Sequence, residues 1–205
     1  AKATFEMKRP LSSCFLLVVM ISLSLFAADA KKDKPVVAAV KSDIPYIRCS
    51  VCEATAKNLF RQITSMRKDA RPGTKLKEID ILETIEKVCD PEKEEGEWIT
   101  KIDLVEDGTA LKLVEQDTPQ LCNTECKTIA RSCADTLGDA DTDIAEALFK
   151  GDIQRAGLES LLCVEVSGAC NKKPPPLPKT RKPGPAFAAR SEDDLEMEKI
   201  KKDME

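Results

Sequence analysis

Residues 49–52 read Cys-Ser-Val-Cys, residues 163–170 read Cys-Val-Glu-Val-Ser-Gly-Ala-Cys, and these two stretches decide the fold. Apolar residues around each stretch recur with helical spacing. If the two helices run antiparallel, the outer cysteines face each other and so do the inner ones, which predicts the disulfides Cys49–Cys170 and Cys52–Cys163. The two ends of the domain are then joined covalently.

Helix geometry limits the disulfide pairings that are open to the four cysteines between these stretches. Two cysteines seven residues apart on a straight helix are separated by roughly 10.5 Å, but a disulfide needs Cα atoms within roughly 7 Å. Cys126–Cys133 is therefore excluded if that segment is helical, and Cys122–Cys133 is excluded more strongly. Pairing Cys89 with Cys126 leaves the other two without partners. Cys89–Cys133 is thus predicted, with Cys122–Cys126 if the first helical turn is irregular around Cys122.

The first thirty residues have the order of a secretory signal peptide. Two basic residues precede an apolar run from Cys14 to Ala28, and a small-residue cleavage pattern ends at Ala30. The run is about 15 residues, shorter than the roughly 20 of a membrane span, although a retained anchor is the alternative. We expect Met7 as the initiator and residues 1–6 as untranslated leader. Cleavage removes Cys14, and the even number of cysteines left fits four disulfides in an oxidising compartment.

Composition argues against catalysis and against nucleic acid. The chain has no histidine, which removes the commonest general base and the commonest metal ligand. Its formal net charge of −4 argues against nucleic-acid binding, because binding phosphates requires a concentrated basic face. With 42% apolar residues the chain can still bury a core. The sequence therefore predicts a non-enzymatic protein with no catalytic residue, no cofactor, no metal ion and no nucleic-acid partner.

The domain boundaries follow from changes in composition and period. Residues 31–43 lack periodicity and read as a flexible leader, and residues 44–173 form the predicted domain. A Pro-rich linker over 174–190 and a charged tail over 191–205, either a loose helix or disorder, complete the chain. Helical spacing predicts helices at 47–66, at 79–89, after Thr118-Pro119, at 144–151 and at 153–167.

One stretch of the predicted domain alternates with the period of a strand. A turn at Asp107-Gly108 separates two alternating runs. The apolar residues of one face are Trp98, Ile102 and Leu104 before the turn and Leu111 and Leu113 after it. The sequence therefore predicts a β-hairpin over about residues 98–114, inserted between helices.

The cysteine spacing resembles the six-cysteine frame of saposin-B-type domains over roughly residues 45–173. The matching residues are Cys49, Cys52, Cys89, Cys133, Cys163 and Cys170. The resemblance implies a mainly α, disulfide-bridged helical fold in which two bridges join the chain ends and a third clasps the middle. The hairpin is not part of a plain saposin, and with it the chain resembles the Canopy family of endoplasmic-reticulum proteins and, more closely, plant saposin-B-type-domain proteins. Cys122 and Cys126 are additional to that frame, and the final residues 202–205 are not a Lys-Asp-Glu-Leu-type signal.

Three functions compete at this level. Canopy proteins are linked to folding and export of membrane receptors, so the resemblance implies a chaperone-like helper that binds secretory or membrane client proteins, in the endoplasmic reticulum lumen or secreted. A lipid-binding saposin acting at membrane surfaces is the first alternative. The second is a thiol-disulfide oxidoreductase using Cys49 and Cys52, although no strand precedes this motif as it does in thioredoxin-like sites.

Overall fold

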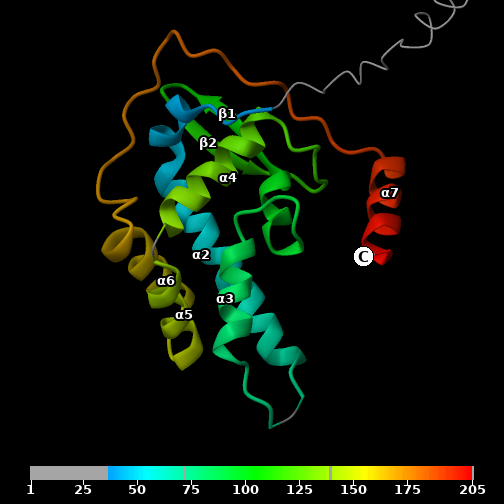
Figure 1. The fold of residues 1–205 in the computed structure, drawn as a ribbon. Coiled ribbons are helices and arrows are strands. Elements are labelled where there is room, and N and C mark those ends of the chain that lie inside the picture. Colours follow the sequence, from blue (N-terminus) through cyan, green and yellow to red (C-terminus); the bar gives the residue numbers. More distant parts are fainter. Residues whose placement is uncertain (1–36, 72, 139, 205) are drawn as a thin grey trace, which may run out of the picture. The chain divides into compact units, whose positions relative to one another are not determined.

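The structure is a computed structural model that describes residues 37–71, 73–138 and 140–204 (Figure 1). Residues 37–204 belong to one compact unit. The predicted signal peptide and the first part of the predicted leader, residues 31–36, lie outside the described residues.

The described chain is mainly helical and carries one small antiparallel sheet, as predicted. In chain order the elements are η1 (Lys41–Asp43), α2 (Ile44–Asp69), α3 (Glu78–Lys87), η2 (Glu94–Lys101), β1 (Ile102–Asp107), β2 (Ala110–Glu115), α4 (Thr124–Leu137), α5 (Asp141–Lys150), α6 (Arg155–Ser160), η3 (Leu161–Val166) and α7 (Glu192–Asp203). Here η1 and η2 are 3₁₀ helices and η3 is a π-helix. Several disulfides tie these elements together.

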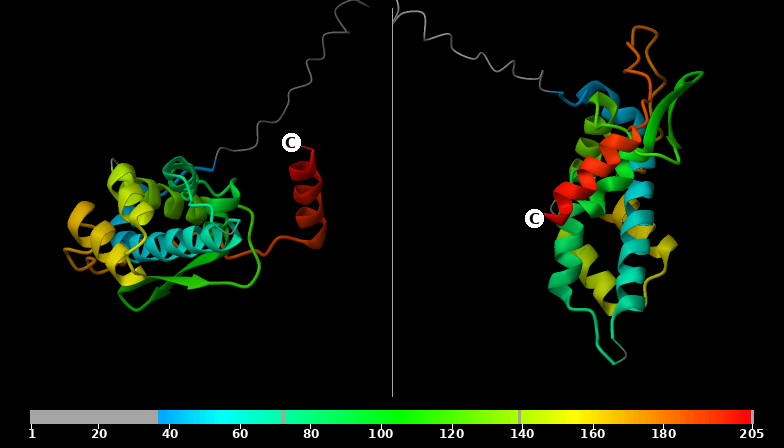
Figure 2. Two further views of the ribbon diagram at one scale, coloured as in Figure 1. Left: turned by 90° about the horizontal axis from the view of Figure 1, so that it is seen from below. Right: turned by 90° about the vertical axis from the view of Figure 1, so that its right-hand side faces the viewer.

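The long helix α2 is the centre of the fold. Pro45 lies in its first turn, where the missing amide donor costs nothing. Its apolar residues recur every three or four positions, and Ile47, Val51, Leu59 and Ile63 have no exposed surface. This face packs against α4, α6, η3 and the hairpin, and Figure 2 shows the hairpin running beside the helix. One contiguous core results.

The hairpin begins later than the sequence predicts. Residues 98–101 belong to the 3₁₀ helix η2, and only from Ile102 do the residues pair, up to Asp107 opposite Ala110. Trp98 therefore does not lie on a strand. Its side chain is 7% exposed and its Nε1–H donates to the carbonyl oxygen of Val88 at 2.9 Å, which anchors η2 to the end of α3. Alternating residues before Ile102 also fit a tight helical turn, so the period alone misplaces the start.

The buried face of α3 also differs from the predicted one. Ile81 and Ile85 are buried one turn apart, and Val88 just beyond the helix is buried as well. Ile79, which the predicted stripe contained, is 55% exposed. In a ten-residue helix two adjacent stripes contain nearly the same number of apolar residues, so helical spacing does not choose between them.

The predicted linker is extended, but it packs on the domain. Residues 174–190, called the strap below, form hydrogen bonds through Leu177 N to Thr109 O at 2.8 Å and through Arg190 N to Pro119 O at 2.8 Å. Ala189 pairs with Gln120 in an isolated β-bridge. A free spacer is therefore the wrong description. In the predicted tail, α7 takes the helical alternative, and Ser191 and Asp194 cap its start.

Candidate functional site

The predicted cysteine pairs are the first candidate site, and the structure joins the same four pairs. Cys49 and Cys52 lie one turn apart near the start of α2 and bond to Cys170 and Cys163 at the other end of the domain. Cys52 and Cys163 are buried, and Cys49 and Cys170 are half-buried. Because both sulfurs of the Cys49-x-x-Cys52 motif are used in this way, the structure contains no dithiol or disulfide within that motif.

The third bridge, Cys89–Cys133, joins the end of α3 to the middle of α4. Cys133 is fully buried, and the hydroxyl of Thr55 on α2 lies 3.3 Å from its sulfur. Thr55 also donates to the carbonyl oxygen of Val51 in its own helix. Three helices therefore meet at this bridge, which closes the middle of the chain.

The fourth bridge, Cys122–Cys126, spans the start of α4. The sequence suggests Thr118-Pro119 as the helix start, but α4 begins at Thr124 with Asn123 as its N-cap. The side-chain oxygen of Asn123 accepts from the backbone N–H of Glu125 at 2.9 Å and from that of Cys126 at 3.1 Å. Cys122 thus precedes the helix, and this irregular connection is the condition under which a pair four residues apart can bond.

A cluster of metal-ligand type near Cys49 is explained by the disulfide there. The sulfurs of Cys49 and Cys170 and a carboxylate oxygen of Glu53 lie within 4.8 Å of one another. The two sulfurs are bonded to each other, so neither is a thiolate. Burial, and secondarily the charge of Glu159, raise the pKa of the Glu53 carboxyl. The cluster is a disulfide with a carboxylate beside it.

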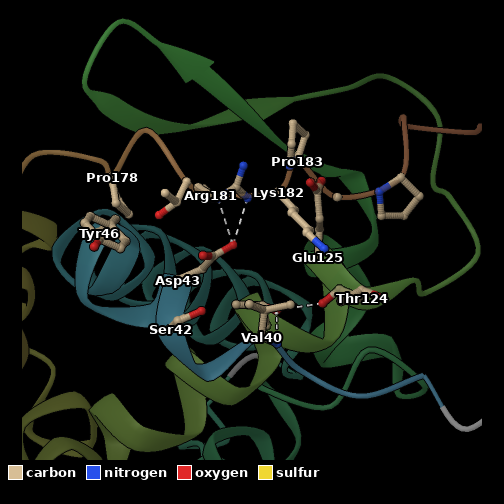
Figure 3. Close-up of a pocket in the computed structure, with 14 residues that line it drawn as sticks. Val40, Ser42, Asp43, Tyr46, Thr124, Glu125, Pro178, Arg181, Lys182 and Pro183 are labelled. Atoms are coloured by element: carbon tan, nitrogen blue, oxygen red, sulfur yellow. Dashed lines mark hydrogen bonds and ion pairs between the residues drawn. The ribbon is translucent and has the colours of Figure 1, made fainter.

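The strap covers a pocket of about 520 Å³ over the first turns of α2 and α4 (Figure 3). Arg181 enters from the strap, and its Nε and Nη2 donate to one carboxylate oxygen of Asp43 at 3.0 and 2.8 Å. Both side chains are almost inaccessible, at 5% and 7% exposure. Nη1 of Arg181 donates to Glu106 near the hairpin turn at 2.5 Å. One side chain therefore ties the strap to the start of α2 and to β1.

Asp43 was predicted to lie in a flexible leader, and that prediction is wrong. Residues 41–43 form η1, and Asp43 is 5% exposed. Just before them, Val40 N donates to the Thr128 hydroxyl of α4 at 2.9 Å. The ordered domain therefore starts ahead of the first long helix.

Glu125 is the second buried acid of this pocket. It is 6% exposed, and its Oε2 accepts from the backbone N–H of Leu104 at 3.4 Å. Burial raises the pKa of its carboxyl, while this hydrogen bond and the charge of Arg181 oppose the increase. The strap passes very close at Gly184, where an added Cβ would lie 2.2 Å from Glu125 Oε1. A side chain at position 184 would therefore force the Glu125 side chain out of its present place.

The hairpin presents a different surface. Leu104 and Leu111 point to the core, whereas Val105 and Val114 on the opposite face are 38% and 37% exposed. Asp103 lies opposite Val114, and Lys112 lies opposite Val105. In the described part of the chain the sheet has two strands, so one edge of each strand has no neighbouring strand. Charged residues beside exposed valines keep such an edge soluble.

Sequence reasoning found the cysteines but missed the pocket. Arg181 lies among prolines and basic residues that are typical of a solvated linker, and its partner Asp43 is 138 residues away. The proline-glycine pair at 183–184 was the available signal, since glycine permits a close approach of the chain.

Comparisons of the chain with protein-family models, with curated proteins and with solved structures found no match. Among the described residues, no helix combines the length and the apolar character needed to cross a membrane.

Proposed function

We propose that this chain is a non-enzymatic, saposin-like helper of the secretory pathway that binds client proteins during folding, as the resemblance to Canopy proteins implies. Eight bonded cysteines are what an oxidising compartment favours, and they agree with the signal-peptide pattern at the start of the sequence. The endoplasmic reticulum lumen, or secretion through it, is part of the proposal.

The observation that carries the proposal is the exposed face of the hairpin together with the outer edge of β2. The outer edge of β1 is already used, because Leu104 N–H donates to Glu125 and the carbonyl oxygen of Ile102 accepts from Gln120. The main-chain groups of an edge strand can pair with an extended polypeptide, and neighbouring side chains then select its residues. Val105 and Val114 supply the apolar contact, and Asp103 and Lys112 supply charges of both signs. An incompletely folded segment, which is extended and partly apolar, has the complementary chemistry. The disulfide-closed helices hold the hairpin in place.

The packing supports client binding over lipid uptake. The apolar residues of the core are buried against one another. Five pockets among the described residues have volumes of about 450–580 Å³, and each of these five has charged side chains in its wall. An acyl chain needs an apolar lining, so lipid uptake would require the core to open.

The test is suppression of aggregation by the purified mature chain, with a heat-denatured reporter enzyme as client. We expect the double variant Val105→Lys/Val114→Lys to lose most of the suppression, because it places charge on the proposed contact face. Ile79→Lys is the matched control, since Ile79 is 55% exposed on α3 outside the hairpin. Equal suppression by the wild type and the double variant would contradict the proposed surface, and no suppression by the wild type would contradict client binding.

Two further measurements separate the alternatives. Crosslinking and co-precipitation from microsomes should recover folding clients or lumenal chaperones with the wild type, and fewer with the hairpin variant. Liposome flotation at neutral and acidic pH should leave the protein in the soluble fraction. Flotation with the vesicles, unaffected by the hairpin variant, would support the lipid-binding alternative instead.

A further inference from the structure

The bridge Cys122–Cys126 differs from the other three in what it connects. It joins residues four apart in sequence, whereas the others join residues 44, 111 and 121 apart. A short loop restricts the unfolded chain least, so this bridge contributes least to stability in the chain-entropy model. Cys122 lies in the segment just before α4 and Cys126 in its first turn, so this bridge joins α4 to no other helix or strand. This bridge therefore contributes little to the stability of the fold.

We propose that Cys122–Cys126 is an exchangeable disulfide that oxidises a dithiol in an extended client polypeptide. This goes beyond client binding, because it assigns a covalent step to a site far from the Cys49-x-x-Cys52 motif in sequence. The geometry at the start of α4 gives each sulfur a different role.

Cys122 is the sulfur that an incoming thiolate attacks. It is half-buried on the irregular segment before α4, whereas Cys126 has no exposed surface. Access therefore selects Cys122, since exchange requires approach of the attacking sulfur to the bond. Next to it, Leu121 is 63% exposed and offers an apolar contact for a side chain beside the client cysteine.

Cys126 is the leaving group. It lies in the first turn of α4, where the helix dipole favours the negative charge that forms on the departing sulfur. The Asn123 side chain accepts hydrogen bonds from two backbone N–H groups of this turn, and these bonds keep the turn helical while the disulfide opens. The α4 scaffold is also fixed independently by Cys133 in its bridge to Cys89.

The exchange balances in two steps. The first client thiolate bonds to Cys122 Sγ, the Cys122–Cys126 bond breaks, and its electron pair passes to Cys126 Sγ, which takes a proton from water. The second client thiolate then attacks the client sulfur of the mixed disulfide, forms the client disulfide and releases Cys122 as a thiolate, which takes up the second proton from water. The client loses two electrons and two protons, and the cysteine pair gains them. One client disulfide forms per chain.

The first experiment finds which bridge opens first. The oxidised mature chain is incubated with limiting dithiothreitol, and free thiols are alkylated at intervals and mapped by peptide mass spectrometry. We expect Cys122 and Cys126 to become labelled at least tenfold faster than the half-buried pair Cys49–Cys170. Labelling of that pair first, or of both pairs at the same rate, would overturn the proposal.

The second experiment measures transfer to a synthetic reduced peptide with two cysteines and a leucine beside the first. The wild type should form one peptide disulfide per chain, and Cys122→Ala/Cys126→Ala should form none. The matched control Cys49→Ala/Cys170→Ala, which lacks a different half-buried bridge, should retain transfer. Transfer by the Cys122/Cys126 variant at the wild-type level would overturn the proposal.

A third readout tests the two roles. With a one-cysteine peptide activated as its mixed disulfide with thionitrobenzoate, Cys126→Ser should form a lasting mixed disulfide at Cys122, because thionitrobenzoate leaves and neither the chain nor the peptide offers a second thiol that resolves the bond. Cys122→Ser should react at least tenfold more slowly, because Cys126 is buried. Equal rates would refute the assignment of the attacked sulfur. Aggregation suppression should be unchanged in these variants, so failure of this inference and failure of client binding are distinguishable.

Discussion

Removal of the two terminal bridges should be strongly cooperative. Cys49–Cys170 and Cys52–Cys163 close loops with sequence separations of 121 and 111. In the chain-entropy model either bridge alone contributes about 5 kcal/mol. That is comparable with the whole free energy of unfolding of many domains, about 5–15 kcal/mol. The perturbations are the paired alanine variants of each bridge and the variant that lacks both.

Because the bridges are nested, the free energy lost with both bridges differs from the sum of the two single losses. Once one bridge exists, the other closes a ring made only of residues 49–52 and 163–170. A ring of about twelve residues contributes about 3 kcal/mol in the same model. Loss of either bridge should therefore cost about 3 kcal/mol, and loss of both about 8 kcal/mol, which exceeds the sum of the single losses by about 2 kcal/mol.

Urea unfolding provides the assay, with the fluorescence of Trp98 as the probe. This tryptophan of η2 is 7% exposed and its indole N–H is bonded to the end of α3, so unfolding exposes it to water. The packing lost with the buried sulfurs of Cys52 and Cys163 occurs in one single and in the double variant, so it cancels in the cycle. If the double variant is unfolded in water, all four proteins are compared in the same stabilising osmolyte. Additive losses would refute the nested-ring reasoning.

Three further predictions concern buried polar groups. Arg181→Ala leaves Asp43 buried without its partner and should lower the free energy of unfolding by up to about 3–5 kcal/mol, or by less if the strap detaches and water reaches Asp43. Trypsin cleavage after Lys179 should also become faster in this variant, and unchanged cleavage would argue against a docked strap. Ser132→Ala should raise stability by about 1 kcal/mol in urea unfolding, because the Ser132 hydroxyl is buried without a hydrogen-bond partner in the described structure. The folded-state pKa of the Glu125 carboxyl is raised above its ordinary value of 4.5, so the folded state binds the proton more tightly than the unfolded state. The wild type should therefore lose stability relative to Glu125→Gln as pH rises through the folded-state pKa. A stability difference between the two proteins that stays constant from about pH 4 to pH 8 would contradict the burial of this carboxyl.

The cysteine frame could be predicted because helix geometry is restrictive. A straight helix fixes the distance between its own cysteines, so Cys126–Cys133 fails on length alone. The end-to-end pairs then need only the assumption of antiparallel helices. Prediction of the fourth bridge depended on an irregular start of α4, and Asn123 provides it. The sequence analysis places the helix start at Thr118-Pro119, whereas Asn123 caps the helix in the structure; both are favourable cap residues, so local propensity does not decide between them.

The pocket under the strap could not be predicted for a different reason. Proline favours an extended backbone over residues 174–185, and an extended segment is equally compatible with a free spacer and with a docked one. The decision depends on Arg181 meeting Asp43, a contact between segments 138 residues apart that no local pattern encodes. The buried face of α3 could not be predicted for a similar reason, because tertiary packing buries Ile81 and leaves Ile79 exposed.

The terminal bridges and the strap are thermodynamically connected. Without any bridge, the contact between Asp43 and Arg181 closes a loop with a sequence separation of 138. With Cys49–Cys170 formed, the path runs through residues 43–49 and 170–181, about nineteen residues, which reduces the entropy of closure by about 1.8 kcal/mol. With only Cys52–Cys163 the path is about ten residues longer, and the reduction is smaller by only about 0.4 kcal/mol. Either bridge therefore suffices to hold the strap near its pocket, so docking of the strap depends on the disulfide-bridged frame as a whole and not on one disulfide.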